Sequence, residues 1–144
     1  MALQAADDRG SVLMLMPAAV LVVLLLGAIS ADLAIVHLRQ HQAVAAAASA
    51  ANDAVTAGLD QTALRRGDGY RLDPARVDQA VTESIEAQGI AAELAEPPVV
   101  TMATPDTVTV ELHLRADYLF ARSLPHGPRS TTVEGMATAT IEQR

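Results

Sequence analysis

Two histidines spaced four residues apart are the first side chains whose types and spacing could do chemistry. On a helix, His37 and His41 would share one face, as two zinc ligands do. The helical metalloprotease pattern places a glutamate directly after the first histidine, but this chain has Leu38 there. No third ligand is apparent nearby in the sequence. We therefore expect two solvated histidines and no metal site.

The other candidate groups are equally weak as sites of catalysis. Glu83 and Glu86 lie three apart, a spacing that acid–base carboxylates can use, but we expect them on a solvated helix face. The segment 67–69 (Gly-Asp-Gly) is too short for a phosphate-binding loop, and no serine stands in a Gly-x-Ser-x-Gly elbow. His113 and His126 are expected to be solvated. The sequence thus predicts a non-enzymatic protein with no catalytic, cofactor-binding or metal-ligating residues and no cofactor.

Composition and charge exclude further classes of function. The chain has no cysteine, so it has neither a disulfide nor a thiolate metal site. Its three aromatic residues, two Tyr and one Phe, are too few for a base-stacking surface. The net charge is −7, and residues 73–144 hold five Arg against eleven acidic residues. Because such a half repels phosphate, we expect no nucleic-acid partner.

The elements that would position any site begin with the apolar stretch Val12 to Ala31. Its twenty residues would span about 30 Å as a helix, the thickness of the hydrocarbon core of a bilayer. Six Leu, four Val and one Ile favour insertion by about 3 to 7 kcal/mol. Pro17 is expected near the first turn of the helix, where its missing N–H costs little. The stretch is predicted to be a transmembrane segment, with the lipid bilayer as its partner.

The helical pattern does not stop where the apolar stretch ends. No Pro or Gly intervenes between Ala28 and Ala57, so one helix is predicted from about Val12 to Ala57, with Gly58 as its first stop. In its projecting part (residues 32–57) an apolar stripe recurs at helical spacing. The members of the stripe are Val44, Ala48, Ala51, Val55 and Leu59.

The rest of the chain predicts a small α+β domain. Asp73 and Pro74 start a short helix over 74–88, and residues 90–94 form a brief strand or an irregular return. Strands are expected at about 99–102, 107–116 and 131–142, the last two with strict apolar–polar alternation. Their apolar face should pack as an antiparallel sheet on the projecting helix. The residues expected to be buried there are Val108, Val110, Leu112, Leu114, Val133, Ala139 and Ile141.

Several of these features together resemble a known family. Arg9-Gly10-Ser11, the apolar span, Asp32, Arg39 and the alanine-rich run after Gln42 are similar to the N-terminus of TadE/TadG-like proteins. These are pilin-related membrane proteins of the Tad (Flp) pilus-assembly systems. The resemblance implies a pilin-like fold, a bacterial membrane location and a non-enzymatic role in the assembly apparatus. Its implied partners are other pilin-like or Tad-apparatus proteins.

The resemblance also marks two candidate sites. Pilin-like precursors are cut after a Gly by a prepilin peptidase, which points to the bond between Gly10 and Ser11. The fifth residue after that cut is usually Glu, but here it is Leu15, and the TadG-like branch commonly lacks the Glu. Asp32, at the outer end of the span, either marks the membrane interface or contacts another membrane helix of the assembly.

The predicted organisation has three parts. Residues 1–11 form a short leader or cytoplasmic tail, 12–31 the single membrane span, and 32–144 the extracytoplasmic domain. The orientation rests on the resemblance, because the charges flanking the span are nearly balanced. Two alternatives stay open. One is a secreted protein whose signal peptide is cut after Ala28-Ile-Ser30. The other is a membrane-tethered binding module unrelated to pili.

Overall fold

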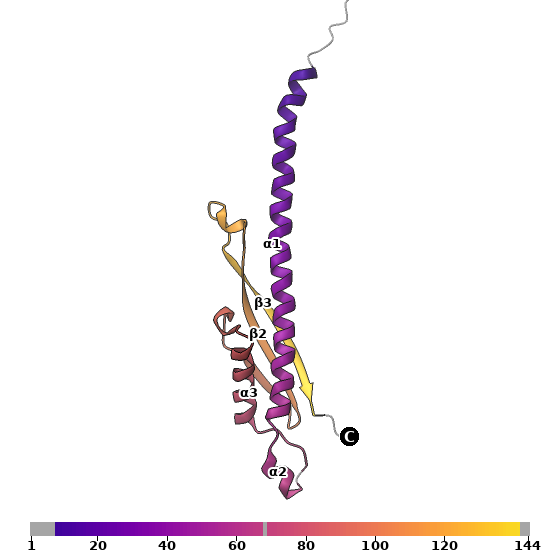
Figure 1. Cartoon of the computed structure of the whole chain (residues 1–144), viewed down its shortest axis with the longest axis vertical. Coiled ribbons are helices and arrows are strands. Elements are labelled where there is room, and N and C mark those ends of the chain that lie inside the picture. The colour runs from indigo at the N-terminus through magenta and orange to yellow at the C-terminus, as the bar shows by residue number, and fades with distance from the viewer. Residues whose placement is uncertain (1–7, 68, 142–144) are drawn as a thin grey trace, which may run out of the picture.

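One long helix dominates the computed structural model, which describes residues 8–67 and 69–141, with side chains from Leu15 on. Helix α1 (Asp8–Ala57) has 50 residues, and a small domain packs along its second half (Figure 1). The prediction of one continuous helix that ends at Ala57 is confirmed. Its start lies four residues before the predicted Val12, so the expected N-terminal tail is helical from Asp8 to Ser11. The remainder of that tail, residues 1–7, lies outside the described residues.

The placement of Pro17 near the first turn is wrong. Because α1 begins at Asp8, Pro17 lies inside the helix. Its ring nitrogen carries no hydrogen, so one helical hydrogen bond is missing at this level. Transmembrane helices tolerate such a residue when neighbouring groups satisfy the freed carbonyl.

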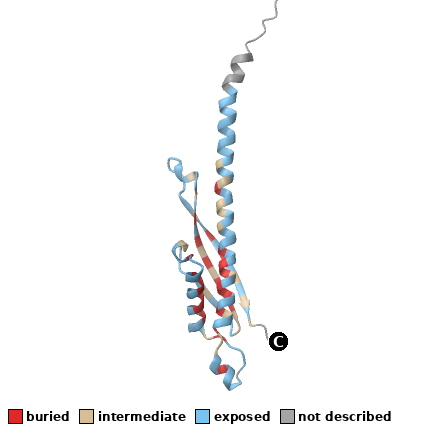
Figure 2. Ribbon diagram, in the orientation of Figure 1, coloured by how far each residue is buried: buried red, intermediate tan, exposed pale blue. Residues whose placement is uncertain are grey.

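Two short helices follow α1. Helix α2 (Gln61–Arg66) lies in the segment that the sequence suggested was only a connector; the side chain of Asp60 caps it, and Gly67 ends it with φ 78°. Helix α3 (Pro74–Ala87) begins as predicted, because the carboxylate of Asp73 accepts a hydrogen bond from the N–H of Ala75 at 3.0 Å. Its buried face lies against α1 (Figure 2). A 3-10 turn, η1 (Ala91–Glu93), forms the return to the sheet.

The sheet has three antiparallel strands in the order β1-β2-β3. They are β1 (Val99–Thr104), β2 (Thr107–Asp117) and β3 (Ser130–Thr140), and a second 3-10 turn, η2 (Ala121–Ser123), lies between the last two. The predicted alternation in β2 is confirmed, since Val108, Leu112 and their apolar neighbours on that face are fully buried. In β3 only Val133 is buried as predicted; Ala139 is half-buried, and so is Ile141, which follows the strand. The strand ends at Thr140 and not at the predicted Glu142, which lies outside the described residues.

The predicted buried face of α1 is rotated from the observed one. Val44 is 42 % exposed, Ala48 and Val55 are half-buried, and only Ala51 of the helical stripe is fully buried. The observed face consists of small side chains, which let the sheet approach the helix backbone closely. They are Ala43, Ala46, Ala47, Ala50, Ala51 and Ala54.

Gly135 marks the closest approach of the sheet to the helix. A Cβ atom built on this residue would lie 2.2 Å from the carbonyl carbon and 2.3 Å from the carbonyl oxygen of Ala43. Gly135 pairs with Leu112 across β2 and β3. Because Leu112 is fully buried, the helix backbone contacts the sheet beside the centre of the core. Only a residue without a side chain fits here.

Candidate interaction site

The first part of α1 is the most conspicuous surface of the molecule. We call Leu15–Ala31 the exposed segment, because large apolar side chains lie uncovered all round it, Leu24 being 65 % exposed (Figure 2). The most apolar window of 18 residues in the described part of α1, from Leu15 on, has a mean hydropathy of 2.6, and only 6 % of the window is buried. A core helix of a soluble protein would be covered by its own chain. By length and composition this helix can cross a membrane once.

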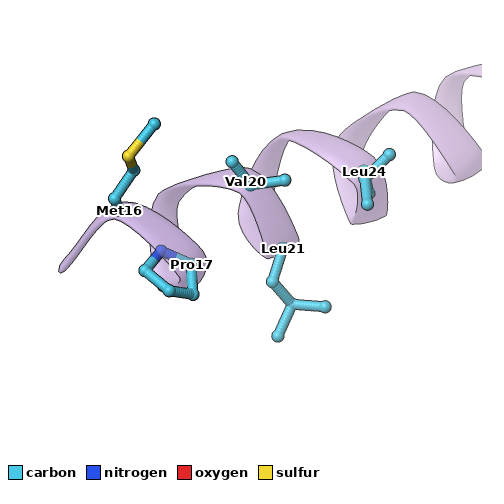
Figure 3. Close-up of a pocket in the computed structure, with 5 residues that line it drawn as sticks. All are labelled: Met16, Pro17, Val20, Leu21 and Leu24. Carbon is cyan, nitrogen blue, oxygen red and sulfur yellow. The ribbon is translucent and has the colours of Figure 1, made fainter. Parts of the chain in front are cut away.

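A shallow hollow interrupts the surface of the exposed segment around Pro17. Figure 3 shows the five side chains that line it, all from one side of α1. They are Met16, Pro17, Val20, Leu21 and Leu24. An apolar hollow on a single helix has no polar group to orient a reactant, so it fits an apolar side chain of a neighbouring helix or a lipid tail.

Asp32 directly follows the exposed segment and is only 7 % exposed. Its carboxylate accepts three hydrogen bonds from consecutive backbone N–H groups in the loop that follows β2. The donors are Leu119 at 2.7 Å, Phe120 at 3.0 Å and Ala121 at 2.8 Å. The burial of Asp32 contradicts the expectation that its carboxylate reaches water, whereas its position at the membrane interface stays a prediction. A contact between Asp32 and another membrane helix stays a prediction, and it would compete with these three bonds.

The environment of Asp32 favours the ionised carboxylate. Burial raises the pKa of this group, but the three N–H donors and the nearby Arg122 outweigh that effect and hold the pKa below its usual value of 3.8. The carboxylate is therefore charged near neutral pH. It acts as a clamp that ties the loop after β2 to α1.

Two further polar contacts hold the domain to α1 between this clamp and the alanine face. Arg39 forms an ion pair with Glu93 in η1, and the side-chain amide of Gln40 donates to the carbonyl oxygen of Glu134 in β3. Both partners of the ion pair are about one-third exposed, so its net contribution is modest. Together with the Asp32 clamp, these contacts connect α1 to the loop after β2, to η1 and to β3.

The two histidines of the first candidate pair do lie together. Their rings meet edge to face with centroids 4.5 Å apart, and the Nε2 atoms of His37 and His41 are 3.1 Å apart. Both residues are exposed, as predicted. Among the described residues, no acidic group or further histidine forms a metal-ligating cluster with them. With two ligands on an exposed helix, the pair does not make a zinc site.

A different cluster, on the outer face of the sheet, was missed by the sequence reasoning. Glu111, His113 and Glu134 each place a ligand atom within 4.8 Å of the others. His113 and Glu134 are paired across β2 and β3, and Glu111 lies two residues before His113 on the same face. The only signal in the sequence would have been the strand register, which joins residues more than twenty positions apart. His113 is also half-buried rather than solvated as predicted.

The hydrogen bonding of His113 disfavours a metal at this cluster. Its Nε2 lies 3.3 Å from Oε1 of Glu111, whereas its Nδ1 is buried and has no hydrogen-bond partner. A proton on Nε2 would point the ring donor toward Glu111. A metal bound at Nε2 would move the proton to Nδ1, where no acceptor is present. The cluster is thus better explained as a close contact between His113 and Glu111, with Glu134 nearby, than as a metal centre.

The remaining candidates do not converge on a site. Glu83 is exposed and accepts a hydrogen bond from Gln79 at 2.7 Å, and Glu86 is exposed beside it on α3. The turn glycines Gly67 and Gly69 have φ values of 78° and 86° and follow α2 rather than a strand. The bond between Gly10 and Ser11 lies in the first turn of α1, while the side chain of Ser11 is outside the described part of the chain.

The candidate functional surface is therefore an interaction surface formed by the exposed segment and the loop that Asp32 clamps beside it. None of the family models, curated proteins or solved structures compared with the chain matches it.

Proposed function

We propose that this chain is a non-enzymatic, pilin-like component of a Tad-type pilus-assembly apparatus. The proposal rests on one observation about α1. It is a single unbroken helix whose first part is apolar and uncovered and whose second part packs on a sheet. Such a helix needs lipid or other helices around its first part, and it holds a folded domain at a fixed distance from them.

The resemblance of residues 10–57 to TadE/TadG-like proteins adds the biological setting. It supports a minor component rather than a repeating filament subunit, because Leu15 stands where filament-forming pilins usually have Glu. Without that carboxylate, the exposed segment offers neighbouring helices only apolar packing and the hollow around Pro17.

In this proposal the domain lies outside the cytoplasm. Protease added to intact spheroplasts should then remove the residues beyond about 40. Full protection of the domain, with digestion only after the membrane is opened, would show the opposite orientation.

The decisive experiment separates anchoring from assembly. A strain that lacks the chain should lose its surface pili, and the wild-type chain should restore them. A matched variant replaces residues 12–31 by a leucine–alanine helix of equal length, which keeps the anchor but removes the native surface. We expect this variant to reach the membrane without restoring pili. Normal piliation of the deletion strain would overturn the proposal.

One feature favours a second candidate, a secreted protein. Ala28 and Ser30 precede Ala31 in a small-x-small pattern, as signal peptidase requires. Against it, α1 runs through this bond without a break, and Asp32 directly beyond it is clamped to the domain. Intact mass of the membrane-extracted protein separates the two, since a secreted product begins at Ala31 and the anchored one retains the apolar span.

A further inference from the structure

We propose that the loop between β2 and β3, residues 118–129, is a second membrane contact that lies in the head-group region of an anionic bilayer, beside the point where α1 leaves it. The inference rests on the proposed membrane anchor and is independent of any role in pilus assembly. We call this segment the membrane loop.

The position of the membrane loop is set by Asp32. This residue is the first after the apolar span, and its carboxylate holds the N–H groups of Leu119, Phe120 and Ala121 at 2.7 to 3.0 Å. The loop therefore lies within hydrogen-bond distance of α1 at the level where the span ends. Figure 1 shows it in orange, extending beyond the rest of the sheet toward the N-terminal half of α1.

The side chains of the membrane loop are unusually apolar for an uncovered turn. Leu119 is 47 %, Phe120 46 % and Leu124 59 % exposed, although they lie within six residues of one another. Two of the three aromatic residues of the chain are here, Tyr118 and Phe120. Aromatic side chains with apolar neighbours are typical of segments at the membrane–water interface. Leu33 on α1, next to Asp32, is also largely exposed, so uncovered apolar surface continues to this level.

Charge distinguishes the membrane loop from the rest of the domain. It holds two of the five Arg of residues 73–144 and none of the eleven acidic residues. Arg122 and Arg129 line a surface hollow together with Ser123 and Asp117. Basic side chains next to exposed apolar ones are the combination that attracts anionic lipid head groups, at about 1 kcal/mol for each Arg near the surface.

The hydrogen bonds to Asp32 also lower the free-energy cost of placing this loop in the head-group region of a bilayer. Backbone N–H groups that leave bulk water must be satisfied within the protein. Three consecutive ones are bound by Asp32, and the N–H of Tyr118 donates to the carbonyl of Arg129 at 3.0 Å. The backbone at the start of the loop is thus satisfied, while its apolar side chains stay free.

The absence of cysteine allows a direct test with the full chain. Phe120→Cys and Leu124→Cys are each labelled with an environment-sensitive fluorophore and reconstituted into vesicles of phosphatidylcholine and phosphatidylglycerol. Leu64→Cys is the matched control: it is 48 % exposed, as Phe120 is 46 %, but lies in α2 beyond the far end of α1. Lipids with a nitroxide at the head group report contact with the bilayer, and iodide reports contact with water.

We expect lipid nitroxide to quench the two loop probes several-fold more than the control probe, and iodide to quench mainly the control. Replacing phosphatidylglycerol by phosphatidylcholine, or Arg122 and Arg129 by Gln, should lower the lipid quenching at Leu124→Cys. Equal quenching of all three probes by iodide would overturn the proposal. Loop probes shielded from iodide but not quenched by lipid would overturn it too, because a second copy of the chain would then cover the loop.

Discussion

Between Leu15 and Ala31, α1 carries large apolar side chains that no other part of the chain covers, whereas between Ala43 and Ala54 the same helix carries small ones that are buried against the sheet. The two segments are continuous in backbone and opposite in side-chain size. In the first segment, large side chains leave apolar surface uncovered. In the second segment, small side chains let a strand touch the helix backbone. The comparison teaches that the apolar content of a helix does not say which half forms the protein core.

The strongest test of the comparison removes a large side chain from the core that packs on the second segment of α1. Leu112→Ala in β2 removes a fully buried side chain and should lower the free energy of unfolding by about 2 to 5 kcal/mol. Thermal unfolding of the domain in detergent, followed by circular dichroism, measures the loss. Thr109→Ala on the opposite face is the control; it removes only the 2.9 Å contact between the hydroxyls of Thr109 and Thr138, and should cost well under 1 kcal/mol. If Thr109→Ala were the damaging change, the observed register would be wrong.

Adding a methyl group to one glycine in each segment's surroundings tests how closely the sheet packs on α1. Gly135→Ala places a Cβ against the backbone of Ala43, so the sheet must move away from α1, at a cost of about 1 to 3 kcal/mol or more. Gly27→Ala in the exposed segment is the matched change, because nothing lies within 4 Å of the added atom. Its unfolding temperature should match that of the wild type. Equal effects of the two substitutions would mean that the sheet does not pack closely on the helix.

Acid should weaken the domain and leave the exposed segment helical, since residues 12–31 contain no titratable side chain. The pKa values of Asp32, Asp60 and Asp106 all lie below the usual value of 3.8. A hydrogen bond from the N–H of Ala63 lowers the pKa of Asp60, and one from the hydroxyl of Thr104 lowers that of Asp106. Because the folded pKa values are lower than the unfolded ones, these groups stabilise the domain above about pH 4, and their contribution is lost as the pH falls through the folded values. Unfolding temperatures measured from pH 6 to pH 3 should decline at the acid end. The decline should be smaller in Asp32→Asn. An equal decline would show that Asp32 does not contribute to the loss of stability in acid.

The smallest effect is expected from Leu21→Ala in the exposed segment. The side chain is 59 % exposed, so its truncation creates no cavity and should leave the unfolding temperature of the domain unchanged. The substitution makes membrane insertion less favourable by only a few tenths of a kcal/mol. Carbonate extraction of membranes should still retain the variant. Unfolding at a lower temperature would indicate that this part of α1 packs against its own domain.

The sequence predicted the features that depend on local pattern. The end of α1 at Ala57, the Asp73 cap of α3 and the buried face of β2 all follow from residue type and spacing. The buried face of α1 did not, because hydrophobicity ranks Val44 above Ala43, while close packing on a strand selects the smaller residue. A contact at the backbone depends on the partner, Gly135, which lies 92 positions further along the chain.

The candidate site was still less accessible from sequence. The Asp32 clamp joins residues 87 to 89 positions apart, and its donors are backbone groups, which every residue type supplies. The helix α2 was missed because six residues are too few for a periodic signal, although its cap at Asp60 was readable. By contrast, the length of the apolar span required no knowledge of the fold.

The continuity of α1 has a mechanical consequence. The helix has no Gly or Pro between Ala28 and Ala57, and the domain grips it at Asp32, at Arg39 and at Ala43. In the membrane-anchored state that we propose, the helix would therefore act as a rigid lever that pivots at the membrane surface. A tilt of about 20° would swing the far end of the helix, about 38 Å beyond Asp32, sideways by about 13 Å, and the domain would move with it. A loop seated on the bilayer at one side of the pivot would act as a stop for that swing in one direction.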